Sequence, residues 1–131
     1  MSTFTSTVTL TQPAEKVFNF LADFNNHKGL IPENVTNWSS SYNEAYFEVQ
    51  NMLKLRLKIS ERHPDTFIEI IPVEQPPFEI KLTWEIKSGN DISEVTFTIT
   101  AELNMMMKMM ASGPLQKLAE HQTQALSSLL K

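Results

Sequence analysis

The 131-residue sequence contains no cysteine, which excludes a disulfide framework, a thiolate nucleophile and a zinc site with cysteine ligands. No apolar stretch approaches the roughly 18 residues of a membrane-spanning helix. The first residues lack the basic and apolar segments of a secretion signal, so we expect a cytoplasmic protein without a membrane span. With a net charge of -4, nucleic acid is not an expected partner.

Motifs that carry chemistry are also scarce. A nucleophile elbow, a phosphate-binding loop and a His-Glu-x-x-His sequence are all absent. The histidines His27, His63 and His121 do not have the spacing of metal ligands, and each is expected at the surface. The sequence therefore predicts no metal site and no cofactor, and it singles out no catalytic residue.

The clearest signal that is present lies near the C-terminus, where a strand leads directly into a long helix. Apolar residues at every second position over 95–103 predict a half-buried strand. Asn104 follows at the position of a helix N-cap. Apolar residues then recur at helical spacing over 115–129, while Gly113 and Pro114 predict a kink or a short break. We expect the rest of the chain to pack on this helix.

Two features of the predicted helix do not fit a simple core face. Gln122 lies within the apolar stripe and needs a partner from backbone, water or a ligand, because an unpaired buried amide costs about 1 to 3 kcal/mol. The methionines at 105–107, 109 and 110 surround Lys108 and cannot all face the sheet, since residues two apart lie on different sides of a helix. They are expected either to fill irregular gaps in the core or to form a contact surface.

Upstream, the sequence predicts one strand, one or two short helices and about six antiparallel strands. Alternation over 4–11 gives the first strand, and Pro13 followed by Glu15 begins a short helix whose apolar face reaches Phe24. Residues 23–29 are polar and irregular, and 30–33 are interpreted as a second helical turn or a loop. The later strands are expected at 38–42, 45–49, 53–59, 67–73, 80–87 and 95–103.

The segment Pro13-Ala14-Glu15-Lys16-Val17-Phe18-Asn19-Phe20-Leu21-Ala22-Asp23-Phe24 directly follows the first predicted strand, and Trp38 lies beyond it. Together with the order of elements, this segment resembles the START-related helix-grip superfamily of pollen allergens, polyketide-cyclase-like proteins and lipid-transfer domains. The resemblance covers nearly the whole chain. It implies one α+β helix-grip domain over 1–131, with a curved antiparallel sheet of about seven strands wrapped around a long C-terminal helix. The glycine-rich loop of the allergen branch has no match, since the chain has three glycines.

The resemblance also implies a cavity for apolar molecules between the sheet and the last helix. The candidate ligand-binding residues, on the helix side of this cavity, on its wall or near its entrance, are Phe20, Phe24, Leu30, Ile31, Trp84, Met106, Met107, Met110 and Gln122. The implied ligand is a small apolar or amphipathic molecule, such as a lipid, a quinone or a polyketide-like compound. An apolar pocket with few polar groups suits such a ligand.

Two other functions stay open beside binding or carriage of a ligand, which is the favoured interpretation. An enzyme of the cyclase or hydratase kind would use His27 or a cavity carboxylate as acid and base, with Asp23 and Glu33 near the expected entrance. A protein-interaction module, similar to the co-chaperone domains of the superfamily, would instead expose the surplus methionines as a contact patch. A homodimer is one form that such an interaction would take.

Overall fold

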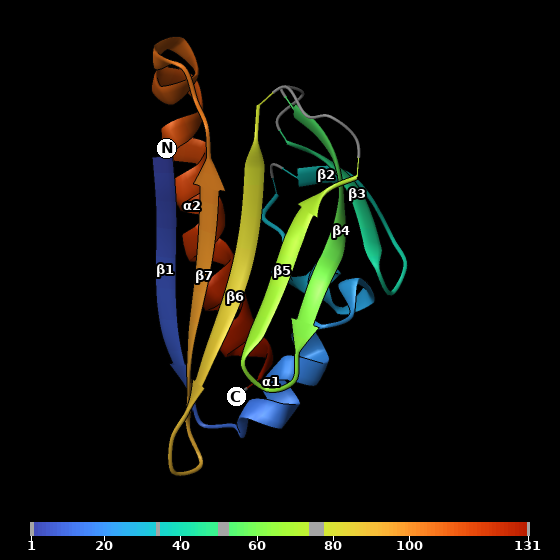
Figure 1. Ribbon diagram of the computed structural model, residues 1–131, viewed down its shortest axis with the longest axis vertical. Helices are drawn as coiled ribbons and strands as arrows, with labels where there is room; N and C mark the ends of the chain where they lie inside the picture. Colours follow the sequence, from blue (N-terminus) through green and yellow to red (C-terminus); the bar gives the residue numbers. More distant parts are fainter. Residues whose placement is uncertain (1, 34, 50–52, 74–77, 131) are drawn as a thin grey trace.

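The architecture is a seven-stranded antiparallel sheet that curls around one long helix (Figure 1). The computed structural model describes residues 2–33, 35–49, 53–73 and 78–130. Its strands are β1 (Ser2–Leu10), β2 (Val35–Ser40), β3 (Glu44–Val49), β4 (Leu53–His63), β5 (Phe67–Pro72), β6 (Ile80–Ser88) and β7 (Ser93–Ala101). Its helices are α1 (Ala14–Leu21), the 3-10 helix η1 (Phe24–Leu30) and α2 (Met105–Leu129). The predicted α+β helix-grip fold is confirmed.

The sheet order is β1-β7-β6-β5-β4-β3-β2, so the first strand pairs with the last and β1 and β2 form the two edges. Helix α2 packs mainly on β1 and β7, while η1 contacts both α2 and β2. The two short helices therefore close the space between α2 and the far strands of the sheet (Figure 1).

Strand β7 forms the centre of the core, as its alternation predicts. Val95, Phe97, Ile99 and Ala101 are completely buried, and the residues between them lie on the outer face. The neighbouring strand β6 aligns Trp84 with Phe97, and the centroids of the two rings are 4.4 Å apart. The hydrophobic effect of burying these side chains is the main force that holds the sheet to the helix.

Helix α2 begins where the sequence predicts. The Asn104 side chain accepts a hydrogen bond from the Met107 backbone N–H at 2.8 Å, which is an N-cap. Pro114 lies inside the helix, but the helix is continuous and is not broken there. Gly113 has no Cβ with which the ring of Pro114 could clash. The buried Leu115 and Leu118 hold the following turns of the helix on the sheet.

One polar contact fastens α2 to β1. Thr123, which the apolar pattern does not include, is buried, and its Oγ1 lies 2.7 Å from Oγ of Ser6. Leu129, which the pattern places on the buried face, is instead half-exposed. The last turn of the helix is therefore rotated slightly relative to the predicted stripe, with Leu126 and Leu130 buried.

The structure corrects several predicted boundaries. Strand β4 continues to His63, past its predicted end at 59. Strand β2 covers 35–40 and not 38–42, and its register with β3 shifts between Thr36 and Ser39, where Asn37 has a φ of 57°. A bulge of this kind hides the alternation on which strand prediction depends. The irregular residues 24–30 form η1, whose N-cap Asp23 accepts from the Asn25 backbone N–H. Among the described helices, none combines the length and hydrophobicity that crossing a bilayer needs.

Candidate functional site

A small, largely enclosed cavity lies where η1, β2 and α2 meet the concave face of the sheet. Its volume is about 20 Å³, which is room for about one water molecule. Most of its wall is apolar, and the polar atoms come from His27, Trp38 and Gln122. The lining residues are Phe24, His27, Ile31, Val35, Trp38, Phe47, Leu57, Ile70, Leu82, Phe97, Leu118 and Gln122.

The strands of the sheet supply part of this wall with the side chains on their concave face. Because successive side chains point to opposite faces, each of the strands β3 to β7 presents one inward residue at the level of the cavity. These residues are Phe47, Leu57, Ile70, Leu82 and Phe97, and all five are buried. Helix α2 adds Leu118 and the partly buried Gln122 from the opposite side.

Trp38 connects the edge of the sheet to η1. Its ring stacks on Phe47 with centroids 5.7 Å apart, and it meets the edge of Phe24 at 6.5 Å. The bulge in β2 beside Trp38 is the kind of irregularity that redirects a side chain relative to a regular strand. One aromatic residue from each of β2, β3 and η1 thus forms one corner of the cavity.

His27 is the ionisable group on the cavity wall. The ring is buried, and Nε2 lies 2.7 Å from the Leu21 carbonyl oxygen, so Nε2 donates and Nδ1 keeps a lone pair. Burial lowers the pKa of His27 from 6.5 to about 4, against the smaller raising effects of the Leu21 carbonyl and of Asp23. The imidazole is therefore neutral at pH 7.

The prediction of a surface position for His27 is wrong, because η1 folds this polar stretch inward over the sheet. The His27 ring meets Phe24 at 5.0 Å and Trp84 at 6.4 Å, in both cases edge to face. His63 and His121 are exposed, as predicted.

Two buried donors have no partner among the described residues. The indole Nε1–H groups of Trp38 and Trp84 are both inaccessible to solvent and make no hydrogen bond. An unpaired buried donor costs about 1 to 3 kcal/mol. Trp38 lines the cavity, so a molecule in this space would lie against the residue that carries one of these two unpaired donors.

Arg62 of β4 holds the corner between α1 and η1. Its Nε and Nη2 donate to the Ala22 carbonyl oxygen at 3.0 and 2.8 Å, and Nη2 also lies 3.3 Å from the Tyr42 carbonyl oxygen. The guanidinium carbon lies 4.3 Å from the centroid of the Tyr42 ring. Ala22 is the C-cap of α1, so these bonds satisfy a helix-end carbonyl and fix the start of η1.

The structure brings three of the nine predicted ligand-binding residues to the cavity wall, namely Phe24, Ile31 and Gln122. Leu30 and Trp84 are fully buried in the core, and Phe20 packs against the core while partly exposed. Met106, Met107 and Met110 lie in the first turns of α2 and do not line this cavity. Whether any of the nine contacts a ligand stays a prediction.

Sequence reasoning missed most of the wall, although part of it carried a signal. The inward positions of the strands follow from alternation, so Phe47, Leu57 and Leu82 belong to the predicted concave face. His27 carried no such signal, because it lies in an irregular, polar segment, and Trp38 lies at the start of a predicted strand whose register the alternation does not define. Their inward orientation depends on η1 and on the bulge in β2.

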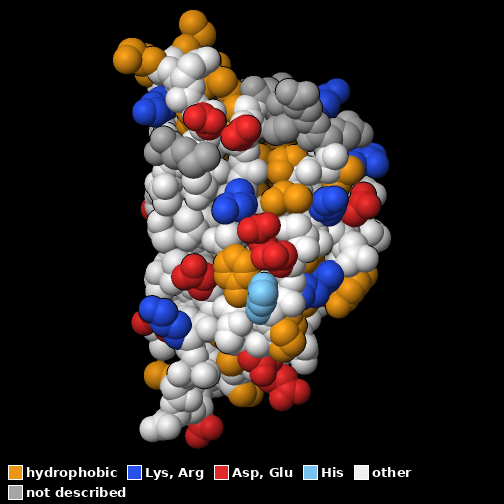
Figure 2. Space-filling model, in the orientation of Figure 1, with side chains coloured by type: hydrophobic (Ala, Val, Ile, Leu, Met, Phe, Trp, Pro, Cys, Tyr) orange, Lys and Arg blue, Asp and Glu red, His pale blue; other side chains and the backbone are white. Residues whose placement is uncertain are grey.

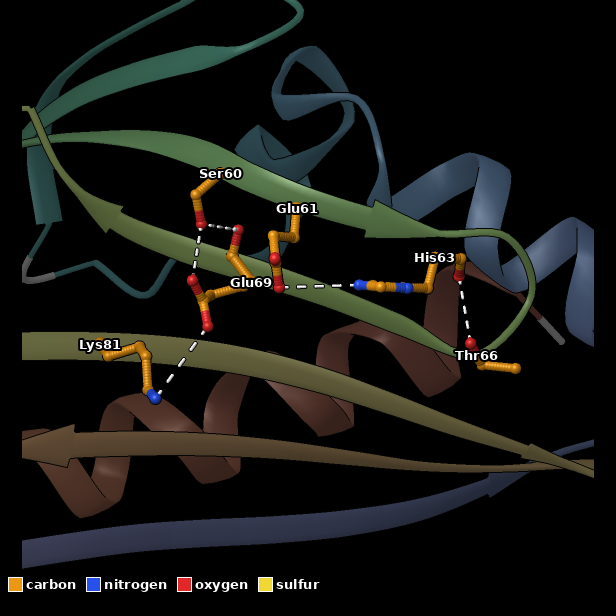
Figure 3. A network of polar contacts seen from close by, with 6 residues as sticks. All are labelled: Ser60, Glu61, His63, Thr66, Glu69 and Lys81. Atoms are coloured by element: carbon orange, nitrogen blue, oxygen red, sulfur yellow. Dashed lines mark hydrogen bonds and ion pairs between the residues drawn. The ribbon is translucent and has the colours of Figure 1, made fainter.

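The outer face of the sheet offers two competing sites, and neither is closed to solvent. A groove of about 200 Å³ over β2, β3 and β4 is polar, and its side chains bond to neighbours, as Tyr46 does to Glu48 at 3.1 Å. Figure 3 shows a second cluster on β4 to β6, in which Ser60 donates to Glu69 and Lys81 pairs with Glu69 at 4.0 Å. Exposed ion pairs of this kind contribute little, so the enclosed cavity is the better candidate.

No protein-family model matches the sequence, and no curated protein matches it. Among solved structures, XoxI from Bacillus cereus is 13% identical with a TM-score of 0.77, over 99% of this chain and 96% of that chain. A START superfamily protein from Mycobacterium smegmatis is 14% identical with a TM-score of 0.70, over 98% and 96%. The Aha1 dimer from Colwellia psychrerythraea is 12% identical with a TM-score of 0.68, over 99% and 96%. These likenesses show the fold, which is the START-like helix-grip fold.

Proposed function

We propose that this protein binds or carries a small apolar or amphipathic molecule in the cavity between the sheet, η1 and α2. The observation that carries the proposal is the unpaired, buried indole N–H of Trp38, a residue that lines a mostly apolar cavity. An acceptor atom on a ligand would remove the cost of that buried donor. The START-like fold of the chain supports the same interpretation.

The polar groups of the wall favour a ligand that carries a hydroxyl or a carbonyl group. The Trp38 indole donates, Nδ1 of the neutral His27 accepts, and the Gln122 amide does both. The other side chains of the wall are apolar and favour an apolar body. Lipids, quinones and polyketide-like molecules share this combination of an apolar body and an oxygen function.

A ligand of that size needs a larger cavity than the closed form provides. We place the opening at η1, because this short 3-10 helix covers the cavity with Phe24 and His27, and its hydrogen-bond geometry is poorer than that of an α-helix. Its start is fixed by the hydrogen bonds of Arg62 to Ala22. Displacement of η1 would join the cavity to solvent while the sheet and α2 keep their places.

The geometry supports binding better than acid–base catalysis. Among the described residues, no aspartate or glutamate lines the cavity. Asp23 instead caps η1 through the Asn25 N–H at 2.9 Å. With a pKa of about 4, His27 is a weak general base at neutral pH, and it has no acid partner on the wall.

The test is a titration with uncharged probes, such as a long-chain alcohol, a naphthol and a short-chain quinone, followed by tryptophan fluorescence. Leu118→Phe, which fills the cavity from α2, should weaken binding by about tenfold or more, because one extra ring occupies the ligand's space. Met109→Phe, an exposed position of the same helix, is the matched control and should bind as the wild type does. Absence of binding to the wild type, or a loss confined to Met109→Phe, would overturn the proposal.

A further inference from the structure

The first two turns of α2 carry an apolar surface that faces solvent. Met105, Met106, Met109 and Met110 are 82%, 71%, 84% and 57% exposed, and we call them the methionine face. At 100° per residue they occupy an arc of about 140° on one side of the helix. The first turns of α2 extend past the start of β1 in Figure 1, and hydrophobic side chains gather at that end of the molecule in Figure 2.

The fold of the single chain does not use this face. In the same turns, only Met107 and Ala111 pack against the core. Gly113 and Pro114 follow, and both residues weaken a helix, glycine through its backbone entropy and proline through its missing N–H. An apolar, weakly held helical segment gains stability from a partner that covers it.

We propose that the methionine face is a homodimer interface, in which the first turns of α2 from two copies pack against each other. This inference does not depend on the proposed ligand. The four side chains expose on the order of 500 Å² of apolar surface, at the upper end of the largest patch on a monomer. Two copies face to face would bury about 1,000 Å², which is the lower limit for a specific interface.

Charge and side-chain chemistry favour a second copy over other partners. Glu102 and Lys108 flank the face with opposite charges, are both exposed, and form no ion pair with another described residue. In a two-fold pair each copy presents the same surface, so both charges of one copy lie at the rim of the contact together with the opposite charges of the other. Unbranched methionine side chains also interdigitate well where a surface meets itself.

A membrane surface is a weaker fit to the same face. Lys108 is the single basic residue within the first two turns of α2, and the whole chain has a net charge of -4. Anionic lipid attracts clusters of several basic residues, at about 1 kcal/mol for each.

Sedimentation velocity over about 5 to 500 µM protein tests the proposal directly. The wild type should form a concentration-dependent dimer, and Met105→Gln with Met109→Gln should raise its dissociation constant by about 100-fold or more. Glutamine keeps the unbranched shape and the helix propensity, so the monomer should stay folded by circular dichroism. Ile92→Gln, an exposed apolar position in the turn between β6 and β7, is the matched control and should leave the dimer intact.

Three further variants separate apolar packing from charge. Met105→Leu with Met109→Leu should keep the dimer, because the apolar area is kept. Glu102→Lys alone should weaken the dimer, and adding Lys108→Glu should restore it. A wild type that stays monomeric at every concentration, or a dimer unaffected by the glutamine pair, would overturn the proposal, as would a monomer that sediments with neutral lipid vesicles through the methionine face.

Discussion

At the scale of single residues, His27 shows how the fold changes the chemistry of a side chain. The unfolded chain exposes an imidazole with a pKa near 6.5, whereas burial in the fold lowers this pKa to about 4. The unfolded state therefore binds a proton at a higher pH than the folded state does. Stability from this residue is complete above pH 6.5 and is lost progressively as the pH falls toward 4.

We therefore expect acid to destabilise the wild type partly through His27. Between about pH 7.5 and about pH 4.5, His27 should account for a loss of about 2 to 3 kcal/mol in the free energy of unfolding. The measurement is the free energy of unfolding in urea, for the wild type and for His27→Gln, at both pH values. The contribution of His27 is the loss on acidification in the wild type minus the loss in His27→Gln. Because carboxylates titrate equally in both proteins, equal pH dependences would contradict the buried, neutral histidine.

Arg62 is the second residue with a specific structural role. Arg62→Met should lower the free energy of unfolding by about 2 to 3 kcal/mol, because the Ala22 carbonyl loses two charge-assisted donors. Arg56→Met, on the exposed side of the same strand, should change it by less than about 0.5 kcal/mol. Equal effects of the two substitutions in denaturant melts would show that Arg62 does not fix the corner between α1 and η1.

At the scale of elements, the strands and helices with regular periods follow from the sequence, and the irregular ones do not. The alternation of β7 and the cap of α2 at Asn104 are local properties, and the structure has both where they were predicted. The 3-10 helix η1 depends on contacts with α2 and β2, which no local pattern contains. The bulge beside Trp38 likewise removes the period that marks a strand.

The grip of the sheet on α2 gives a prediction at this scale. Leu118→Ala should destabilise the protein by about 2 to 5 kcal/mol, because Leu118 is buried against the sheet and its loss leaves a cavity. The exposed neighbour Lys117→Ala should have an effect within about 0.5 kcal/mol. A denaturant melt in which the two variants match would mean that the sheet does not grip this face of the helix.

At the scale of the whole molecule, the fold class follows from the order of elements, whereas the size of the cavity does not. Six strands, η1 and α2 each place one or two side chains around the same small space. Its volume of about 20 Å³ is set by the fit of side chains far apart in the sequence, such as Phe47 and Leu118.

Binding of a ligand beside Trp38 is tested most directly by a ¹H–¹⁵N NMR titration with the same uncharged probes. The chain has two tryptophans, so two indole N–H resonances report on the cavity wall and on the core beside it. A bound probe should shift the Trp38 indole resonance most and the amide resonance of the exposed Met109 little. Probes that leave the Trp38 indole unmoved, or that shift only residues of the methionine face, would contradict binding at this site.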